Sequence, residues 1–198
     1  MGSFYALGID PGFANVGFAL CKCSLLSSGT RVVEPVKAGL IRTEKSEKKL
    51  SVLASNDNTR RMREIAHAVD SLLGVGPEGG ALVRVICAES MSFPRNAGSA
   101  AKMAMSWGVL AALAHVRQAA VFQASPMQIK VHMCGKKTAS KEDIREAVDK
   151  ATDGVLVGML VDHRGNALTR KEFLEHPYDA MAAVLTCLES EALQFAWR

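Results

Sequence analysis

The stretch that decides the fold is Phe4-Tyr5-Ala6-Leu7-Gly8-Ile9-Asp10-Pro11-Gly12-Phe13-Ala14-Asn15-Val16-Gly17-Phe18-Ala19-Leu20. An apolar strand over about residues 4–9 leads into Asp10, the Pro-Gly pair stops it, and a second strand leaves near residue 16. A carboxylate at the tip of a buried strand is costly unless a cation meets it. We therefore predict a cationic partner for Asp10, and a divalent metal ion is the natural candidate.

The size and composition of the chain are typical of an ordinary α/β protein. With 198 residues, 48% apolar and 22% charged, one domain over residues 1–198 is expected. No apolar run approaches the ~18 residues of a membrane helix, and the start does not resemble a signal peptide. The five cysteines are an odd, scattered set, which favours reduced thiols rather than a disulfide framework. We expect a cytoplasmic protein that makes no use of a membrane.

The first part of the chain predicts an antiparallel meander followed by a helix and a strand. Strands are expected over about 4–9, 16–23 and 32–41, a mobile polar loop over 42–58, a helix over 59–73 and a strand over 81–88. The last of these strands delivers Glu89 at its end, which repeats the arrangement of Asp10. The sequence thus places two carboxylates at the ends of two buried strands.

The second part predicts mainly helices. The stretch 97–118 is apolar nearly all round, which indicates a central helix, and a fifth strand begins at Val121. Ser125 and Ser140 each resemble a helix N-cap. Residues 152–170 give no clear pattern, and a last helix is expected to begin near Pro177. His176 and Asp179 are three residues apart at its start and therefore on one side.

Positive charge is concentrated between Gln123 and Lys141. This segment contains no acidic residue and carries four lysines, Lys130, Lys136, Lys137 and Lys141. Such a patch of +4 is able to neutralise phosphates of a polyanion. A solvated lysine-rich loop is the alternative interpretation of the same residues.

The order of these elements resembles the RNase H-like nucleases and integrases. Within that superfamily, the chain is most similar to RuvC-type Holliday-junction resolvases. The resemblance rests on four blocks, Gly8-Ile9-Asp10-Pro11-Gly12 with Gly17, Ala88-Glu89-Ser90 with Arg95-Asn96-Ala97-Gly98-Ser99-Ala100, Gln128-Ile129-Lys130 with Lys141, and His176-Pro177-Tyr178-Asp179-Ala180-Met181-Ala182. It implies a mixed five-stranded sheet, three antiparallel strands followed by two parallel ones, flanked by helices.

The resemblance also implies the site residues. Asp10, Glu89, His176 and Asp179 would form a metal site that holds two Mg²⁺ ions, with Mn²⁺ able to substitute. Whether His176 binds metal directly or orients water stays open. Taken singly, each of these residues has a structural alternative: a helix cap for His176, complementation of the helix dipole for Asp179 and a basic partner for Glu89.

The implied substrate is four-way DNA, cut symmetrically, and the implied assembly is a homodimer that acts near the nucleoid. Lys130 and Lys141 match lysines that contact DNA phosphates and support catalysis, with Lys130 placed among the catalytic residues. Lys136, Lys137 and Arg95 extend the predicted DNA contact, and Phe93 is an aromatic wedge or, alternatively, a core residue. The turn Phe13-Ala14-Asn15-Val16 lacks the basic and hydroxyl residues common at this place in the family.

Two alternatives from other classes stay open, and a third is disfavoured by the length of the chain. A related nuclease would act on other branched DNA or on RNA, and a non-catalytic protein would bind junctions without turnover. An ATP-binding protein of related fold also begins with a Gly-Ile-Asp-x-Gly turn, but it needs two such domains, for which 198 residues leave too little room.

Overall fold

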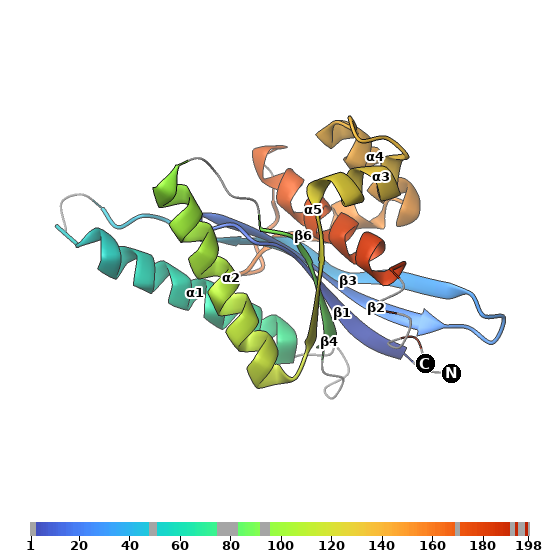
Figure 1. The fold of residues 1–198 in the computed structure, drawn as a ribbon, viewed down its shortest axis with the longest axis horizontal. Helices are drawn as coiled ribbons and strands as arrows, with labels where there is room; N and C mark the ends of the chain where they lie inside the picture. The colour runs from blue at the N-terminus through green and yellow to red at the C-terminus, as the bar shows by residue number, and fades with distance from the viewer. Residues whose placement is uncertain are drawn as a thin grey trace.

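A computed structural model describes residues 3–47, 51–74, 83–91, 96–168, 171–190, 193 and 197, with the side chains of 171–174 outside the description. A six-stranded mixed sheet forms the centre, in the order β5-β4-β1-β2-β3-β6. The strands are β1 (Ser3–Asp10), β2 (Asn15–Leu25), β3 (Arg31–Arg42), β4 (Val83–Glu89), β5 (Ala120–Ala124) and β6 (Leu160–Asp162). The helices are α1 (Ala54–Gly74), α2 (Ala97–Arg117), α3 (Pro126–Cys134), α4 (Lys141–Ala151) and α5 (Lys171–Leu188), with a 3₁₀ turn at Val155–Met159 (Figure 1).

The predicted fold class is confirmed, and the number of strands is larger by one. β1, β2 and β3 pair antiparallel, while β4 joins β1 in parallel and β5 joins β4 in parallel. The additional strand, β6, pairs in parallel with β3 through Ala38, Gly39 and Leu40. It has only three residues and lies within the stretch that gave no clear pattern, so neither period nor length marked it as a strand.

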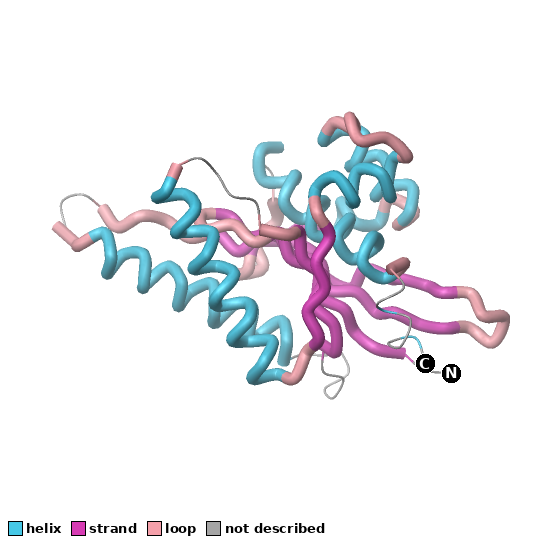
Figure 2. The backbone as a smooth tube through the Cα atoms, in the orientation of Figure 1, coloured by secondary structure: helices cyan, strands magenta, loops and turns pink. Residues whose placement is uncertain are grey.

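Helices cover the two faces of the sheet in different ways. α1 and α2 lie against one face, and α5 lies against the other with α3 and α4 beyond it (Figures 1 and 2). Because side chains alternate along a strand, β1 sends Tyr5, Leu7 and Ile9 into the core with α1 and α2. Its residues Phe4 and Ala6 enter the core with α5. We call these two sides the α1/α2 face and the α5 face.

Glycines on the α5 face allow the helix to approach the sheet closely. A Cβ placed on Gly8 would lie 2.2 Å from the carbonyl oxygen of Ala180, and one on Gly17 would lie 2.0 Å from that of His176. Real Cβ atoms do not approach a carbonyl oxygen so closely, so any larger residue would push α5 outward. The two glycines thus hold the start of α5 against the end of β1.

Two helix starts differ from the predicted ones. α1 begins at Ala54 rather than at 59, because Asp57 is held from outside the helix: its Oδ1 accepts hydrogen bonds from the backbone N and Oγ of Ser46, at 3.1 and 2.6 Å. Part of the predicted loop 42–58 is therefore helix. α5 begins at Lys171, and Pro177 lies inside it, although a proline in this context favours the first turn.

The helix predicted over 97–118 is confirmed as α2, but its predicted central position is wrong. α2 buries only Ser106, Leu110 and Ala114, while Val116 is 71% exposed. α2 packs beside α1 on the α1/α2 face. The apolar residues that it exposes include Ala101, Ala104, Ala111, Ala112 and Val116. In the described residues, no helix is long and apolar enough to span a bilayer, and all five cysteines carry free thiols.

Candidate active site

Asp10 and Glu89 lie side by side at one edge of the sheet. In the parallel pair β1–β4, Ile9 stands opposite Ala88, so the next residue of each strand is one of the two acids. By alternation they follow Gly8 and Cys87 onto the α5 face. The predicted strand-end placement of both acids is what the structure shows.

α5 brings His176 and Asp179 to the same edge. The His176 Nδ1 atom lies 2.6 Å from Asp10 Oδ2, and the two side chains are 28% and 19% exposed. The hydrogen bond to Asp10 raises the pKa of His176, against the opposing effect of burial. At 2.6 Å, Nδ1 serves as the donor to an ionised Asp10 carboxylate, which leaves Nε2 as the second polar atom of His176.

Lys141, at the first position of α4, joins the cluster from the side. Its Nζ lies 3.2 Å from Asp179 Oδ2 and 2.8 Å from Glu175 Oε2. Burial lowers the pKa of Lys141, but the hydrogen bonds and charges of these two carboxylates outweigh it and raise the pKa overall. Sequence analysis did not select Glu175; its position one helical turn before Asp179 was the available signal.

The carboxylates influence one another electrostatically. Burial, and then the charges of Asp10 and Asp179, raise the pKa of Glu89 from 4.5 to about 7. Burial and the charge of Asp10 also raise the pKa of Asp179. Partly buried acids whose pKa values rise through mutual repulsion mark a place where added positive charge is favourable.

The chemistry of this donor set suits a hard divalent cation. Three carboxylates supply the oxygen ligands that Mg²⁺ and Mn²⁺ prefer, and one imidazole adds a nitrogen. As the side chains stand, no group of three or more His, Cys, Asp or Glu within the described ranges has the spacing to hold a metal ion. Asp10 instead pairs with His176, and Asp179 with Lys141.

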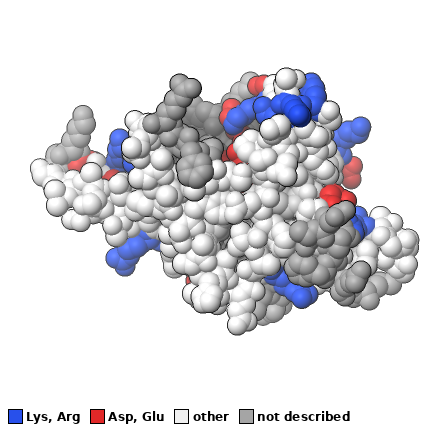
Figure 3. Space-filling view, viewed as in Figure 1, with Lys and Arg blue, Asp and Glu red and all other residues white. Residues whose placement is uncertain are grey.

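The predicted basic patch is more neutralised than its sequence indicates. Lys136 Nζ lies 3.1 Å from Asp143 Oδ1, and Lys141 is paired with acids of α5. Lys137 is exposed and Lys130 is partly buried. Basic side chains still gather over α3 and α4 (Figure 3). The predictions for Phe93 and Arg95 fall outside the described residues.

Solved structures of low sequence identity share this fold. The Thermus thermophilus RuvC structure is 21% identical, with a TM-score of 0.63 and 92% of each chain covered. T. thermophilus RuvC in complex with a Holliday junction substrate is 20% identical, with a TM-score of 0.67, covering 98% of this chain and 95% of that one. This likeness shows that the fold is an RNase H-like α/β fold.

Sequence comparison gives the family. The family model described as crossover junction endodeoxyribonuclease RuvC matches residues 6–153, which is most of the chain. The chain therefore belongs to this family. The protein of that name from Natranaerobius thermophilus is 28% identical over 142 residues, 72% of this chain and 76% of the relative. The one from Brevibacillus brevis is 30% identical over 140 residues, 71% and 73% respectively. The family match ends before His176 and Asp179.

Proposed function

We propose that this chain is an endonuclease that resolves four-way DNA junctions by symmetric, metal-dependent hydrolysis of phosphodiesters. The observation that carries the proposal is the meeting of Asp10, Glu89 and Asp179 at one edge of the sheet in a chain of the RuvC family. These three acids come from β1, β4 and α5, and burial, followed by the repulsion of neighbouring carboxylates, raises the pKa values of Glu89 and Asp179.

In this proposal, Asp10, Glu89, Asp179 and His176 hold two Mg²⁺ ions, for which Mn²⁺ substitutes. The ions, when bound, activate a water molecule and stabilise the departing 3′ oxygen. Asp10 pairs with His176, and its charge acts on both Glu89 and Asp179. A carboxylate binds a metal ion in its ionised form, so Glu89 would have to lose its proton to take part. His176 orients Asp10 through Nδ1 and has Nε2 available for a ligand or a water. We infer that Lys141 steers the scissile phosphate, since its ammonium group lies beside Asp179.

The proposed DNA contact extends from the acids across α3 and α4. Lys130, Lys136, Lys137 and Lys141 would contact phosphates, with Lys130 also supporting catalysis. The Asp143 carboxylate beside Lys136 lowers the net charge of this surface, so we assign Lys137 a larger share of the binding than Lys136. Phe93 and Arg95 are proposed to act at the junction centre, with Phe93 as the wedge.

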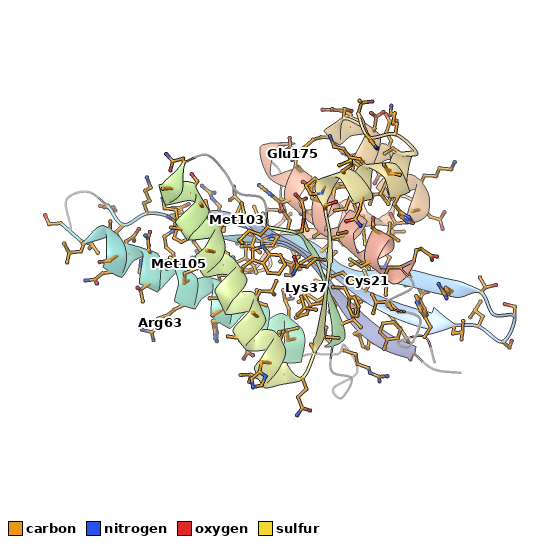
Figure 4. The ribbon with its side chains drawn as sticks, viewed as in Figure 1. Cys21, Lys37, Arg63, Met103, Met105 and Glu175 are labelled. Carbon is orange, nitrogen blue, oxygen red and sulfur yellow. The ribbon has the colours of Figure 1, made fainter. Side chains whose placement is uncertain are left out.

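A homodimer follows from the symmetry of the proposed reaction. Two symmetric nicks in a nearly two-fold junction require two copies of the site. The exposed apolar side of α2 offers a surface for the second copy, and Met103 and Met105 lie on this helix (Figure 4). Trp107 and Met105 both pack against the core of the α1/α2 face. We infer that residues 1–198 act as a single domain, in the cytoplasm and with the nucleoid, where junctions form.

Two alternatives share part of this site. A nuclease for other branched DNA or RNA would use the same acids, and a non-catalytic binder would use the lysines alone. The test is a Mg²⁺ titration against synthetic four-way, three-way, flap and linear substrates and an RNA duplex. Paired symmetric nicks on the four-way substrate support the proposal. Cleavage confined to RNA, or tight junction binding without cleavage at any Mg²⁺ concentration, would replace it with the corresponding alternative.

A further inference from the structure

In the turn that follows Asp10, three successive carbonyl groups accept hydrogen bonds from other elements. Ser106 Oγ of α2 donates to Gly12 O at 2.7 Å. Thr43 Oγ1, at the end of β3, donates to Phe13 O at 2.8 Å, and Thr43 N donates to Ala14 O at 2.9 Å. Inside the turn, Gly12 N donates back to Asp10 O at 3.0 Å. Elements far apart in the sequence therefore hold the backbone on which the Asp10 carboxylate stands.

Arg61 of α1 completes this arrangement. Its Nε donates to Thr43 Oγ1 at 2.9 Å, and its Nη2 donates to Thr43 O at 3.3 Å and to Phe13 O at 3.5 Å. Because Thr43 Oγ1 accepts from Arg61, the hydroxyl proton of Thr43 is directed to Phe13 O. The guanidinium thus orients the hydroxyl that holds the turn.

The burial of Arg61 calls for a specific role. Arg61 is only 3% exposed, and its guanidinium carbon lies 4.3 Å from the centre of the Phe13 ring, which shields it from water. Among the described residues, no carboxylate forms an ion pair with it, although removing a charge from water is expensive. An aliphatic side chain would fill the space at lower cost. What only arginine supplies here is the fork of donors directed at Thr43 and Phe13.

The contacts of Arg61 are with the turn and with Thr43. We therefore expect Arg61 to act on the site through the position of the turn.

We propose that Arg61 is a positioning residue which, with Thr43 and Ser106, fixes the turn at residues 11–14 and thereby the Asp10 carboxylate that receives the metal ions. This inference rests on the proposed function, because it concerns the same site. The turn itself has no basic or hydroxyl side chain at Phe13-Ala14. Here Arg61 of α1 supplies the basic group, Thr43 and Ser106 supply the hydroxyls, and Phe13 covers the Arg61 guanidinium.

The first test compares Arg61→Lys with Arg63→Lys. Lysine at position 61 keeps the positive charge but lacks the several N–H donors of the guanidinium group. Arg63 is the control position, because it is exposed on the same helix and points away from the sheet (Figure 4). Loss of a group that orients a metal ligand reduces metal affinity or activity by about 10–100-fold. We expect Arg61→Lys to raise the Mg²⁺ concentration for half-maximal cleavage and the Mn²⁺ dissociation constant of the protein alone by about that factor. Junction binding in EDTA should change less than about twofold, and Arg63→Lys should match wild type.

The second test covers the case in which Arg61→Lys fails to fold. Ser106 Oγ also lies 3.3 Å from Lys102 O, four residues back, as the weaker of the two acceptors for its single proton, and Ser71 Oγ donates to His67 O at 2.8 Å. Ser106→Ala removes the bond to the turn, whereas Ser71→Ala removes only an intrahelical bond. We expect Ser106→Ala to weaken Mn²⁺ binding severalfold without loss of Tm beyond that of Ser71→Ala.

The outcomes separate the inference from the proposed function. Weaker Mn²⁺ binding in folded Arg61→Lys or Ser106→Ala supports the inference, even if wild type proves unable to cut junctions. Wild-type Mn²⁺ affinity in both folded variants would overturn it. A wild-type protein that binds no Mn²⁺ would overturn it as well, since no metal ligand would then need positioning. Loss of junction binding in EDTA with unchanged Mn²⁺ affinity would also overturn it, because it would make Arg61 a DNA contact.

Discussion

The two faces of the sheet are built from the same strands in opposite ways. On the α5 face, glycines and small residues let the helix touch the backbone of β1 and β2, and four polar site residues meet at the edge. On the α1/α2 face, large apolar side chains of the strands pack against α1 and α2, and α1, β2 and β3 line an open pocket of about 530 Å³. Close packing thus coincides with the charged site, and looser packing with the face that carries none of it.

This difference teaches which interactions set the geometry of the site. A helix that contacts strand backbone is fixed by backbone atoms, which hardly adjust, whereas side chains that fill a gap adjust by changing rotamers. We therefore expect the site to depend strongly on small changes at the α5 face and weakly on equal changes at the α1/α2 face, except at Arg61, Thr43 and Ser106, which hold the turn after Asp10. The following experiments test that contrast.

The largest contrast should come from two neighbouring residues of β1. Asp10→Asn removes a ligand charge from the α5 face, and we expect the cleavage rate to fall by at least about a thousandfold while junction binding persists. Ile9→Val, one residue earlier and buried on the other face, should cost about 1 kcal/mol of stability and leave cleavage near wild type. Single-turnover cleavage and electrophoretic binding assays measure both. Normal turnover by Asp10→Asn would contradict the metal role of Asp10.

A second contrast uses one methyl group on each face. In Gly8→Ala the new Cβ would lie 2.2 Å from Ala180 O, whereas in Gly74→Ala it would lie 3.5 Å from Arg117 Nη2. We expect Gly8→Ala to lower the free energy of unfolding by about 1–3 kcal/mol and, by displacing α5, to slow cleavage by about 100-fold. Gly74→Ala should stabilise by up to about 1 kcal/mol. Urea unfolding measures the change in stability, and a cleavage assay measures the change in rate. Equal effects of Gly8→Ala and Gly74→Ala would contradict the expected difference between the two faces.

A third contrast concerns the pH dependence of stability. The pKa of Glu89 is raised to about 7, so the folded state holds its proton more tightly and loses stability as pH rises from about 5 to 8. In metal-free buffer, Glu89→Gln should therefore be more stable than wild type at pH 8, by on the order of 2 kcal/mol, with the gain absent at pH 4.

On the other face, the Arg117 guanidinium lowers the pKa of Asp70. Asp70 thus contributes stability that is present above its unfolded pKa and is lost as pH falls. Asp70→Asn should destabilise at pH 8 and have no effect at pH 2. Urea unfolding of both variants across this pH range is the measurement, and the same sign for both at pH 8 would contradict the assignment.

The smallest effect is expected from single lysines. Lys137→Ala should reduce the slope of log binding constant against log salt concentration by about 0.9 if Lys137 contacts one phosphate. Lys37→Ala, at the rim of the pocket on the α1/α2 face, should leave the slope unchanged. Fluorescence anisotropy with a labelled junction at several KCl concentrations measures this. A larger change in this slope for Lys37→Ala than for Lys137→Ala would indicate that DNA binds at the α1/α2 face instead.

Much of this architecture was predictable because its signals are local. The apolar run ending at Asp10 and the strand ending at Glu89 predicted both the sheet and the placement of the acids, and the spacing of His176 and Asp179 predicted their common side. The resemblance supplied the order of the strands. The last strand, β6, was missed because three residues are too few to show an alternation.

The remaining features depend on contacts between distant segments. In the sequence, Arg61 is one of several basic residues on an amphipathic helix. Nothing near it indicates that its side chain contacts Thr43 and Phe13. Likewise, the acid that neutralises Lys136 stands beyond the segment chosen for its positive charge. The position of α2 was predicted wrongly because an apolar helix has the same composition in a core and at an exposed surface.

The most direct test of the central claim is an anomalous difference map from a crystal soaked in Mn²⁺. The proposal predicts two peaks about 3.5–4 Å apart, both ligated by Asp10, with Glu89 and Asp179 each on one ion. A well-ordered site with both carboxylates turned away from Asp10 and no Mn²⁺ peak between them would contradict it.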